Sequence, residues 1–129
     1  MIEFAVRTAR RTEFVDITAG VQDAVSKLGV AEGAVLVFVP HTTAAVTINE
    51  GADPDVVRDL DLALGRLVPR EGGYAHAEGN ADAHIKSTLV GCSLMVPVAG
   101  GRLALGTWQT LWFCEFDGPR RRSVRVVRL

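Results

Sequence analysis

The run AVLVFV at residues 34–39 is continuously apolar and is bounded by Gly33 and Pro40. A short apolar run between such residues is typical of a strand that lies buried in the centre of a sheet. Polar residues follow at once in His41-Thr42-Thr43, and residues 44–48 resume a strand-like pattern up to Asn49-Glu50. The chain therefore places chemically capable side chains directly at the end of a predicted central strand.

Further strands and helices are predicted on both sides of this run. Alternating residues 2–8 and 13–18 predict two strands, and helical spacing over residues 21–28 predicts a helix with Thr18 as its N-cap. Asp53-Pro54 begins a second helix, and a shorter third helix is expected at about residues 81–90. Four strands are then predicted, over residues 94–98, 103–105, 107–116 and 123–129. This order predicts one compact α+β domain over residues 1–129, with a largely antiparallel or mixed sheet and about three helices packed on one side.

Composition and charge limit the classes of function. A chain of 129 residues with 48% hydrophobic and 22% charged residues is typical of a single globular domain. The net charge of −1 gives no reason to expect a nucleic-acid partner, and no apolar run reaches the ~18 residues of a membrane helix. Cys92 and Cys114 have no CxxC spacing, so we expect two buried free thiols. No signal peptide is recognisable after Met1, and we expect a soluble cytoplasmic protein.

The three histidines are the first candidates for chemistry. His41 follows the central strand, whereas His76 and His84 lie in the polar run GGYAHAEGNADAHIKSTLVG at residues 72–91. A catalytic zinc site needs three such ligands and one open position. The eight-residue spacing between His76 and His84 matches no zinc motif, so a metal site and three ordinary loop histidines both stay open. Asp82 is a ligand, an N-cap or a partner that orients a ligand.

Polar residues around the predicted strand ends form a second group. Thr42 and Thr43 either form a turn or orient His41 and bind phosphate oxygens. Glu50 is either a general base or an ordinary exposed glutamate. Five arginines crowd the last ten residues, and they either form a solvated strand face or supply phosphate contacts from residues 120–122.

The strand predicted over residues 107–116 carries polar residues that are far apart. Trp108, Cys114 and the residues alternating with them are expected to face the core, and Gln109, Glu115 and Asp117 the opposite side. At ~3.3 Å per residue, Gln109 and Asp117 would lie about 26 Å apart. They cannot serve one small pocket in one subunit. Either one of them is structural, or a second subunit brings the distant end into a shared site, which indicates a symmetric oligomer.

Five short blocks together resemble the YjbQ-like family, also called secondary thiamine-phosphate synthases. The blocks are His41-Thr42-Thr43-Ala44, Asn49-Glu50, Gly79-Asn80-Ala81-Asp82-Ala83-His84, Gly106-Thr107-Trp108-Gln109 and Asp117-Gly118-Pro119-Arg120. The resemblance implies a compact α+β subunit that assembles as a homotrimer, with a polar pocket near the subunit interface. It also implies a divalent metal ion, zinc, held by His41, His76 and His84.

The activity implied by this resemblance is that of a transferase. A pyrimidine diphosphate and a thiazole phosphate would be joined to thiamine phosphate, with release of pyrophosphate, so the partner is a small phosphorylated substrate. The residues expected to take part in catalysis are Glu50, Asn80, Asp82 and Gln109. The residues expected to bind the substrate are Thr42, Thr43, Asn49, Lys86, Trp108, Asp117 and Arg120. Two alternatives are a metal-dependent hydrolase of a small phosphorylated substrate and a non-catalytic trimeric metabolite-binding module.

Overall fold

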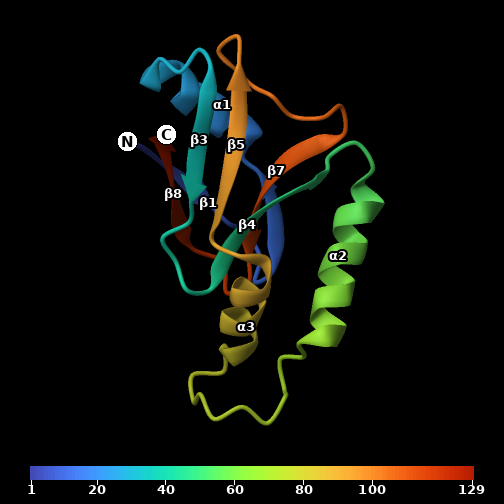
Figure 1. The fold of residues 1–129 in the computed structure, drawn as a ribbon. Helices are drawn as coiled ribbons and strands as arrows, with labels where there is room; N and C mark the ends of the chain where they lie inside the picture. The colour runs from blue at the N-terminus through green and yellow to red at the C-terminus, as the bar shows by residue number, and fades with distance from the viewer.

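The strands form two antiparallel sheets in the computed structural model, which describes residues 1–129 (Figure 1). The five-stranded sheet has the order β1-β8-β3-β5-β6. Its strands are β1 (Ile2–Arg7), β8 (Arg121–Arg128), β3 (Gly33–Phe38), β5 (Ser93–Ala99) and β6 (Arg102–Leu103). The three-stranded sheet has the order β2-β7-β4, built from β2 (Glu13–Asp16), β7 (Gln109–Glu115) and β4 (Ala44–Glu50). With three helices, this arrangement confirms the predicted α+β class.

The main core lies between the two sheets and the first helix. Strand β3 is the middle strand of its sheet, as predicted, and its Val35 and Val37 are fully buried. Leu36 and Phe38 on the other side of β3 are only half-buried, so the apolar run is buried on one face and not on both. From the smaller sheet, Phe113 reaches the same core.

Helix α1 (Thr18–Leu28) contributes Val21, Ala24 and Val25 to this core. It begins one residue earlier than its predicted cap implies, because Ile17 precedes the helix and Thr18 is already helical. The Thr18 hydroxyl instead accepts a hydrogen bond from the Leu111 backbone N–H at 3.0 Å, which ties the helix start to β7. Gly29 ends the helix in the left-handed conformation, with φ of 67°, as is usual for a glycine there.

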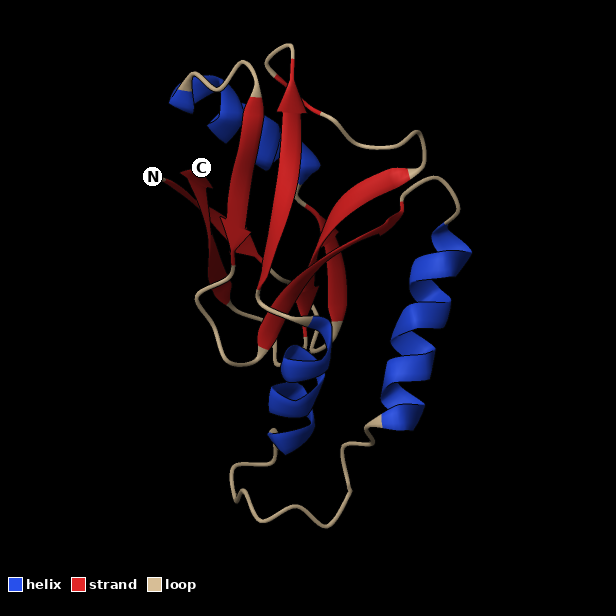
Figure 2. Ribbon diagram, viewed as in Figure 1, coloured by secondary structure: helices blue, strands red, loops and turns tan.

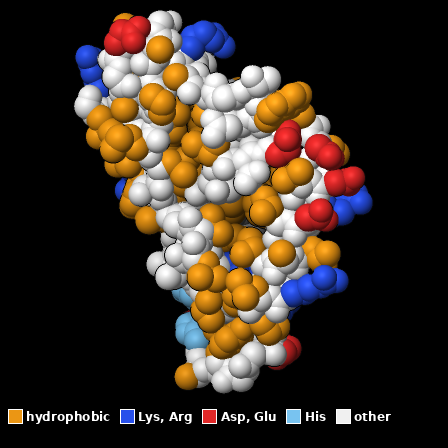
Figure 3. Space-filling view, turned by 45° about the vertical axis from the view of Figure 1, so that its right-hand side comes forward, with side chains coloured by type: hydrophobic (Ala, Val, Ile, Leu, Met, Phe, Trp, Pro, Cys, Tyr) orange, Lys and Arg blue, Asp and Glu red, His pale blue; other side chains and the backbone are white.

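Helix α2 (Pro54–Leu67) begins as predicted, with the Asp53 side chain accepting from the Asp55 N–H and proline in the first turn. None of its residues is buried, and Leu62 and Leu67 are 50% and 71% exposed. A long loop joins α2 to α3 (Ala81–Val90), and both helices project beyond the sheets (Figure 2). Hydrophobic side chains gather on the face of the molecule that carries α2 and α3 (Figure 3). No helix is long and apolar enough to cross a membrane.

Two expectations about burial hold only in part. On β7 the face that enters the main core carries Leu111 and Phe113, which are fully buried, whereas Trp108 before the strand is 64% exposed. Cys114 belongs with the opposite face, in a small second cluster under α3. Cys92 is exposed, so only Cys114 is a buried thiol.

Candidate functional site

Several elements end at the same edge of the fold and bring polar residues together there. In the register of the smaller sheet Ala44 pairs with Glu115, and in the larger sheet Arg7 pairs with Arg121. The loop after β3, the start of β4, the end of β7 and the start of β8 therefore meet. Helix α3 packs against β4 at this edge and adds its own polar residues.

Two of the three histidines line one open hollow of about 360 Å³, which we call the histidine hollow. Its lining residues are His41, Thr42, His84, Ser87, Thr88, Gly91 and Cys92. The ring of His76 meets the ring of His84 edge-on, with 5.2 Å between centroids. Figure 3 shows histidine side chains, in pale blue, close together on the lower part of the molecule.

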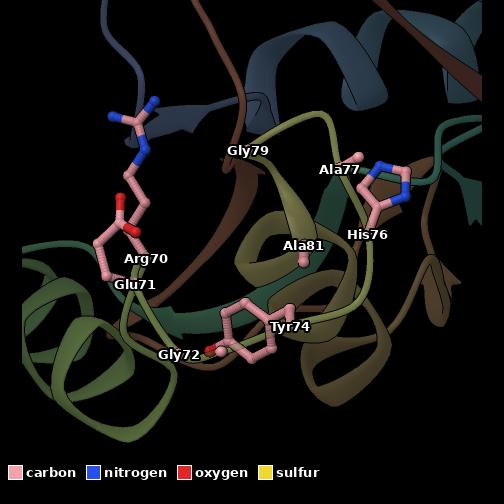
Figure 4. Close-up of a pocket in the computed structure, with 9 residues that line it drawn as sticks. Arg70, Glu71, Gly72, Tyr74, His76, Ala77, Gly79 and Ala81 are labelled. Carbon is pink, nitrogen blue, oxygen red and sulfur yellow. The ribbon is translucent and has the colours of Figure 1, made fainter.

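The loop that carries His76 borders a second, smaller cavity of about 200 Å³ (Figure 4). Arg70, Tyr74, His76 and Gly79 are among its lining residues. The Tyr74 hydroxyl donates to the Pro69 carbonyl oxygen at 2.6 Å, which holds the loop against the end of α2. This cavity is therefore formed almost entirely by one loop.

His41 is held by the backbone of β8. Its Nε2 accepts a hydrogen bond from the Ser123 N–H at 3.0 Å. Burial lowers the pKa of His41, and the positive charge of Arg122 lowers it further. His41 is therefore a neutral imidazole near neutral pH.

A buried ion pair between Glu115 and Arg122 lies behind the histidine hollow. Arg122 Nε donates to Glu115 Oε2 at 2.8 Å, and Arg122 Nη2 donates to the other carboxylate oxygen and to the Thr43 hydroxyl. The Thr8 hydroxyl also donates to Glu115, at 2.9 Å. Burial alone would raise the pKa of Glu115, but these donors and the Arg122 charge hold it below its usual value. Thr43 therefore serves to anchor the loop and is not free to contact a ligand.

Asp82 is fully buried at the start of α3, between two basic side chains. The two terminal nitrogens of the Arg11 guanidinium, Nη2 and Nη1, donate to its two carboxylate oxygens at 3.0 and 3.2 Å. Burial would raise the pKa of Asp82, but the Arg11 hydrogen bonds and the charges of Arg11 and Lys86 hold it below its usual value. Lys86 is 4% exposed, and its ammonium lies 3.7 Å from Asp82 and 5.8 Å from the Phe116 ring centroid. The first distance is longer than a hydrogen bond.

Asn80 and Arg120 both bind Asp117. Asn80 Nδ2 donates to Asp117 Oδ2 at 2.8 Å, and Arg120 Nη2 donates to the same oxygen at 3.1 Å. Asn80 Oδ1 is buried and has no hydrogen-bond partner. Arg120 is half-exposed, so it can still reach a ligand.

The other predicted site residues lie at the opposite end of β4 and β7. Glu50 pairs with Gln109 there, six residues along β4 from Ala44, a separation of about 20 Å at ~3.3 Å per residue. Glu50, Pro54 and Trp108 border a separate hollow of about 400 Å³, and Asn49 lies beside it in the chain. Glu50 Oε2 accepts from the Ala52 N–H, and Gln109 Oε1 from the Gly106 N–H. Glu50 and Gln109 therefore do not meet Asn80 and Asp82 within one subunit.

The three histidines do not form a metal centre within one subunit. No three His, Cys, Asp or Glu side chains are grouped in a way that could hold an ion. One lone pair of His41 is also already engaged by Ser123. The predicted ligand set therefore does not fit a zinc ion in the arrangement seen here.

Sequence reasoning missed the part that long-range ion pairs play. Arg11 and Thr8 were assigned no role, and Glu115 was placed on a face that was not expected to be core. One signal was present: an acidic residue within the apolar strand TLWFCEF at residues 110–116 needs a buried cation. The cation is Arg122, for which the sequence offered a solvated strand face or a phosphate contact but no buried ion pair.

Comparisons with known proteins agree over nearly the whole chain. A family model described as UPF0047 protein YjbQ-like matches residues 2–129. UPF0047 protein YugU of Bacillus subtilis is 49% identical over 122 residues, which cover 94% of this chain and 92% of that protein. UPF0047 protein MJ1081 of Methanocaldococcus jannaschii is 48% identical over 126 residues, which cover 98% and 91%. A crystal structure of a YjbQ/UPF0047 family protein from Clostridium acetobutylicum has a TM-score of 0.97 at 49% identity, covering 100% of both chains.

Proposed function

Because this chain belongs to the UPF0047 YjbQ-like family, we propose that it is a transferase acting on small phosphorylated heterocycles at the histidine hollow. The proposed reaction joins a pyrimidine diphosphate to a thiazole phosphate. A bond forms between the thiazole nitrogen and the pyrimidine methylene carbon while the bond from that carbon to pyrophosphate breaks. The observation that supports this proposal is the shared lining of the hollow by His41 and His84, together with the exposed hydroxyl of Thr42.

The lining of the hollow suits phosphate oxygens. Thr42 carries an exposed hydroxyl that can donate to such an oxygen, and each histidine can offer a ring N–H. The hydroxyls of Ser87 and Thr88 instead donate to the carbonyl oxygens of Ala44 and His84, at 2.7 and 2.9 Å. Among the charges that act on His41, the positive charge of Arg122 has the largest effect and is opposed by the negative charge of Glu115. As pyrophosphate departs, its leaving oxygen gains negative charge. Fixed donors and cations directed at that oxygen would stabilise the transition state.

The charges at this edge leave one surplus cation. Asp82, Glu115 and Asp117 each have a guanidinium partner, namely Arg11, Arg122 and Arg120. Lys86 is the fourth cation and shares Asp82 with Arg11, its ammonium lying 3.7 Å from that carboxylate. It is two residues from His84, which separates the two side chains by about 200° around the helix. In our proposal Arg120 contacts the phosphate, whereas Lys86 supplies positive charge from behind α3.

We further propose that the protein works as a cytoplasmic homotrimer. Leu62, Leu67 and Leu89 are at least half exposed, and α2 has no buried residue. A neighbouring copy that covers this apolar surface would remove it from water. The same contact could bring Glu50 and Gln109 of one copy to the hollow of the next. A reducing cytoplasm would suit the exposed thiol of Cys92.

The zinc ion predicted from the family resemblance is kept as a separate proposal. His76 and His84 are close enough to act together, so the remaining ligands would come from another copy. Elemental analysis of the untagged protein and of its His76→Ala and His84→Ala variants tests this. A metal content that is unchanged in both variants would contradict it.

The proposed reaction is tested by incubating the protein with the pyrimidine diphosphate and the thiazole phosphate and measuring released pyrophosphate. His84→Ala should lower the rate by at least ~100-fold if His84 transfers a proton or positions the leaving group. Lys27→Ala, on the exposed side of α1, is the matched control and should leave the rate unchanged.

Other results would select the alternatives. Chelator-sensitive hydrolysis of phosphoesters without coupling would indicate a hydrolase. Thermal stabilisation by the substrates without turnover would indicate a binding module. A monomer at micromolar concentration in light scattering would contradict the shared site.

A further inference from the structure

Beyond the end of β3, the His41 side chain accepts a backbone hydrogen bond that a neighbouring strand would otherwise accept. Strand β8 pairs with β1 from Arg121 to Val126, but with β3 only from Arg125, opposite Phe38, to Arg128, opposite Val35. In an antiparallel strand, alternate residues direct their N–H and C=O groups to opposite neighbours. Beyond the end of β3, the Ser123 N–H has no strand partner and donates instead to His41 Nε2 at 3.0 Å. The imidazole therefore satisfies a backbone donor that the sheet would leave unpaired.

This hydrogen bond determines which ring nitrogen of His41 carries the proton. A backbone N–H can only donate, so Nε2 must offer its lone pair. In a neutral imidazole one nitrogen accepts and the other carries the hydrogen. Nδ1 is therefore the N–H of a ring that lines the histidine hollow.

We propose that His41 is a hydrogen-bond donor to the substrate through its Nδ1–H, and that it is not a ligand of a metal ion. This inference rests on the proposed function for the nature of the substrate. A metal ligand must present a lone pair to the ion. Nε2 already gives its lone pair to Ser123, and Nδ1 carries the hydrogen. Binding of an ion at Nδ1 would move that hydrogen to Nε2, where two donors would face each other.

The surroundings indicate what the Nδ1–H would meet. Thr42 adds an exposed hydroxyl to the hollow, and among the charges that act on the His41 ring that of Arg122 has a larger effect than the opposing charge of Glu115. Donors and positive charge are complementary to an anionic oxygen. We therefore assign the Nδ1–H of His41 to a phosphate oxygen of the substrate.

The first test observes the His41 ring by NMR in the unmodified protein. Long-range ¹H–¹⁵N spectra of the histidine side chains distinguish the two neutral tautomers and respond to metal binding. His41 should show the Nδ1–H form, and one equivalent of Zn²⁺ should leave its signals in place. Nε2–H signals, or signals of His41 that move with the first equivalent of Zn²⁺, would overturn the inference.

Ser123 offers a matched pair of variants for the same measurement. Ser123→Pro removes the N–H that donates to His41, and this N–H takes part in no hydrogen bond between strands. Ser123→Ala keeps the N–H and serves as the control. Only the proline variant should show a mixture of His41 tautomers. An unchanged tautomer in a folded proline variant would contradict the role of the Ser123 N–H.

The donor role is tested by calorimetric titration with inorganic pyrophosphate. His41→Ala should weaken binding by about tenfold or more, as expected for the loss of a hydrogen bond to a charged group. In His41→Asn the amide nitrogen can take the place of Nδ1–H, so binding should stay within about threefold of the wild type. An asparagine variant no better than the alanine variant would overturn the donor role. If the wild type binds no pyrophosphate, the proposed function and the donor role both fail, whereas the spectra still decide whether His41 is a metal ligand.

Discussion

Replacing Arg122 with methionine should remove a large part of the stability of the fold. Arg122 is 3% exposed and donates to both carboxylate oxygens of Glu115 and to Thr43. Without it, Glu115 stays fully buried with only the Thr8 hydroxyl and the Asp117 N–H as donors. Removing one partner of a buried ion pair costs about 3–5 kcal/mol. A domain of this size has about 5–15 kcal/mol in total, so we expect the midpoint of thermal unfolding to fall by roughly 10–20 °C.

Urea unfolding of four variants tests this reasoning. Arg121→Met changes the exposed neighbour on the same strand and should cost less than ~0.5 kcal/mol. The double variant Arg122→Met/Glu115→Leu removes both charges, so it should be more stable than Arg122→Met by at least ~1 kcal/mol. Glu115→Leu alone leaves Arg122 unpaired and completes the cycle. An Arg122→Met variant within ~1 kcal/mol of Arg121→Met, or costs that simply add, would show that the pair is not the buried, coupled unit seen here.

Three further predictions follow from single residues. The pKa of Glu115 is lowered in the folded state, so the unfolded chain takes up a proton on this carboxylate at a higher pH than the folded protein does. The contribution of Glu115 to the free energy of unfolding should therefore be complete above about pH 5 and decrease as the pH falls below about 4. Urea midpoints measured between pH 6 and 3 should show a smaller loss in Glu115→Gln, and equal slopes would contradict this. A thiol reagent should modify one cysteine of the folded protein quickly, and Cys92→Ala should abolish that phase, because Cys114 is buried and its pKa is raised. Two fast thiols would be inconsistent with this burial. A Cβ at Gly118 would lie 2.3 Å from the Arg10 carbonyl oxygen, so Gly118→Ala should destabilise the protein by about 1–3 kcal/mol. Gly65→Ala, in α2 with nothing within 4 Å, should instead stabilise it by up to ~1 kcal/mol, as measured by thermal unfolding.

The order and type of the elements were predictable because their signals are local. Asp53 and Pro54 mark the start of α2, and Gly29 the end of α1, by chemistry that acts within one helical turn. The run at residues 34–39 likewise predicted a central strand. The short blocks around His41, His84 and Gln109 also indicated the family before any fold was known. None of these inferences needed to know which distant segments are in contact.

What the sequence by itself determined about this protein is therefore its α+β class, its element boundaries to within a few residues, and its family. Only the tertiary structure decided which strand faces enter the core, which of the two cysteines is exposed, and which charges pair. Arg11 meets Asp82 across 71 residues of chain, and Ser123 meets His41 across 82. Such contacts depend on the register of strands from distant parts of the chain, and a shift of one residue would direct every side chain to the other face. The role of His41 depends on this register, because its partner Ser123 lies on β8.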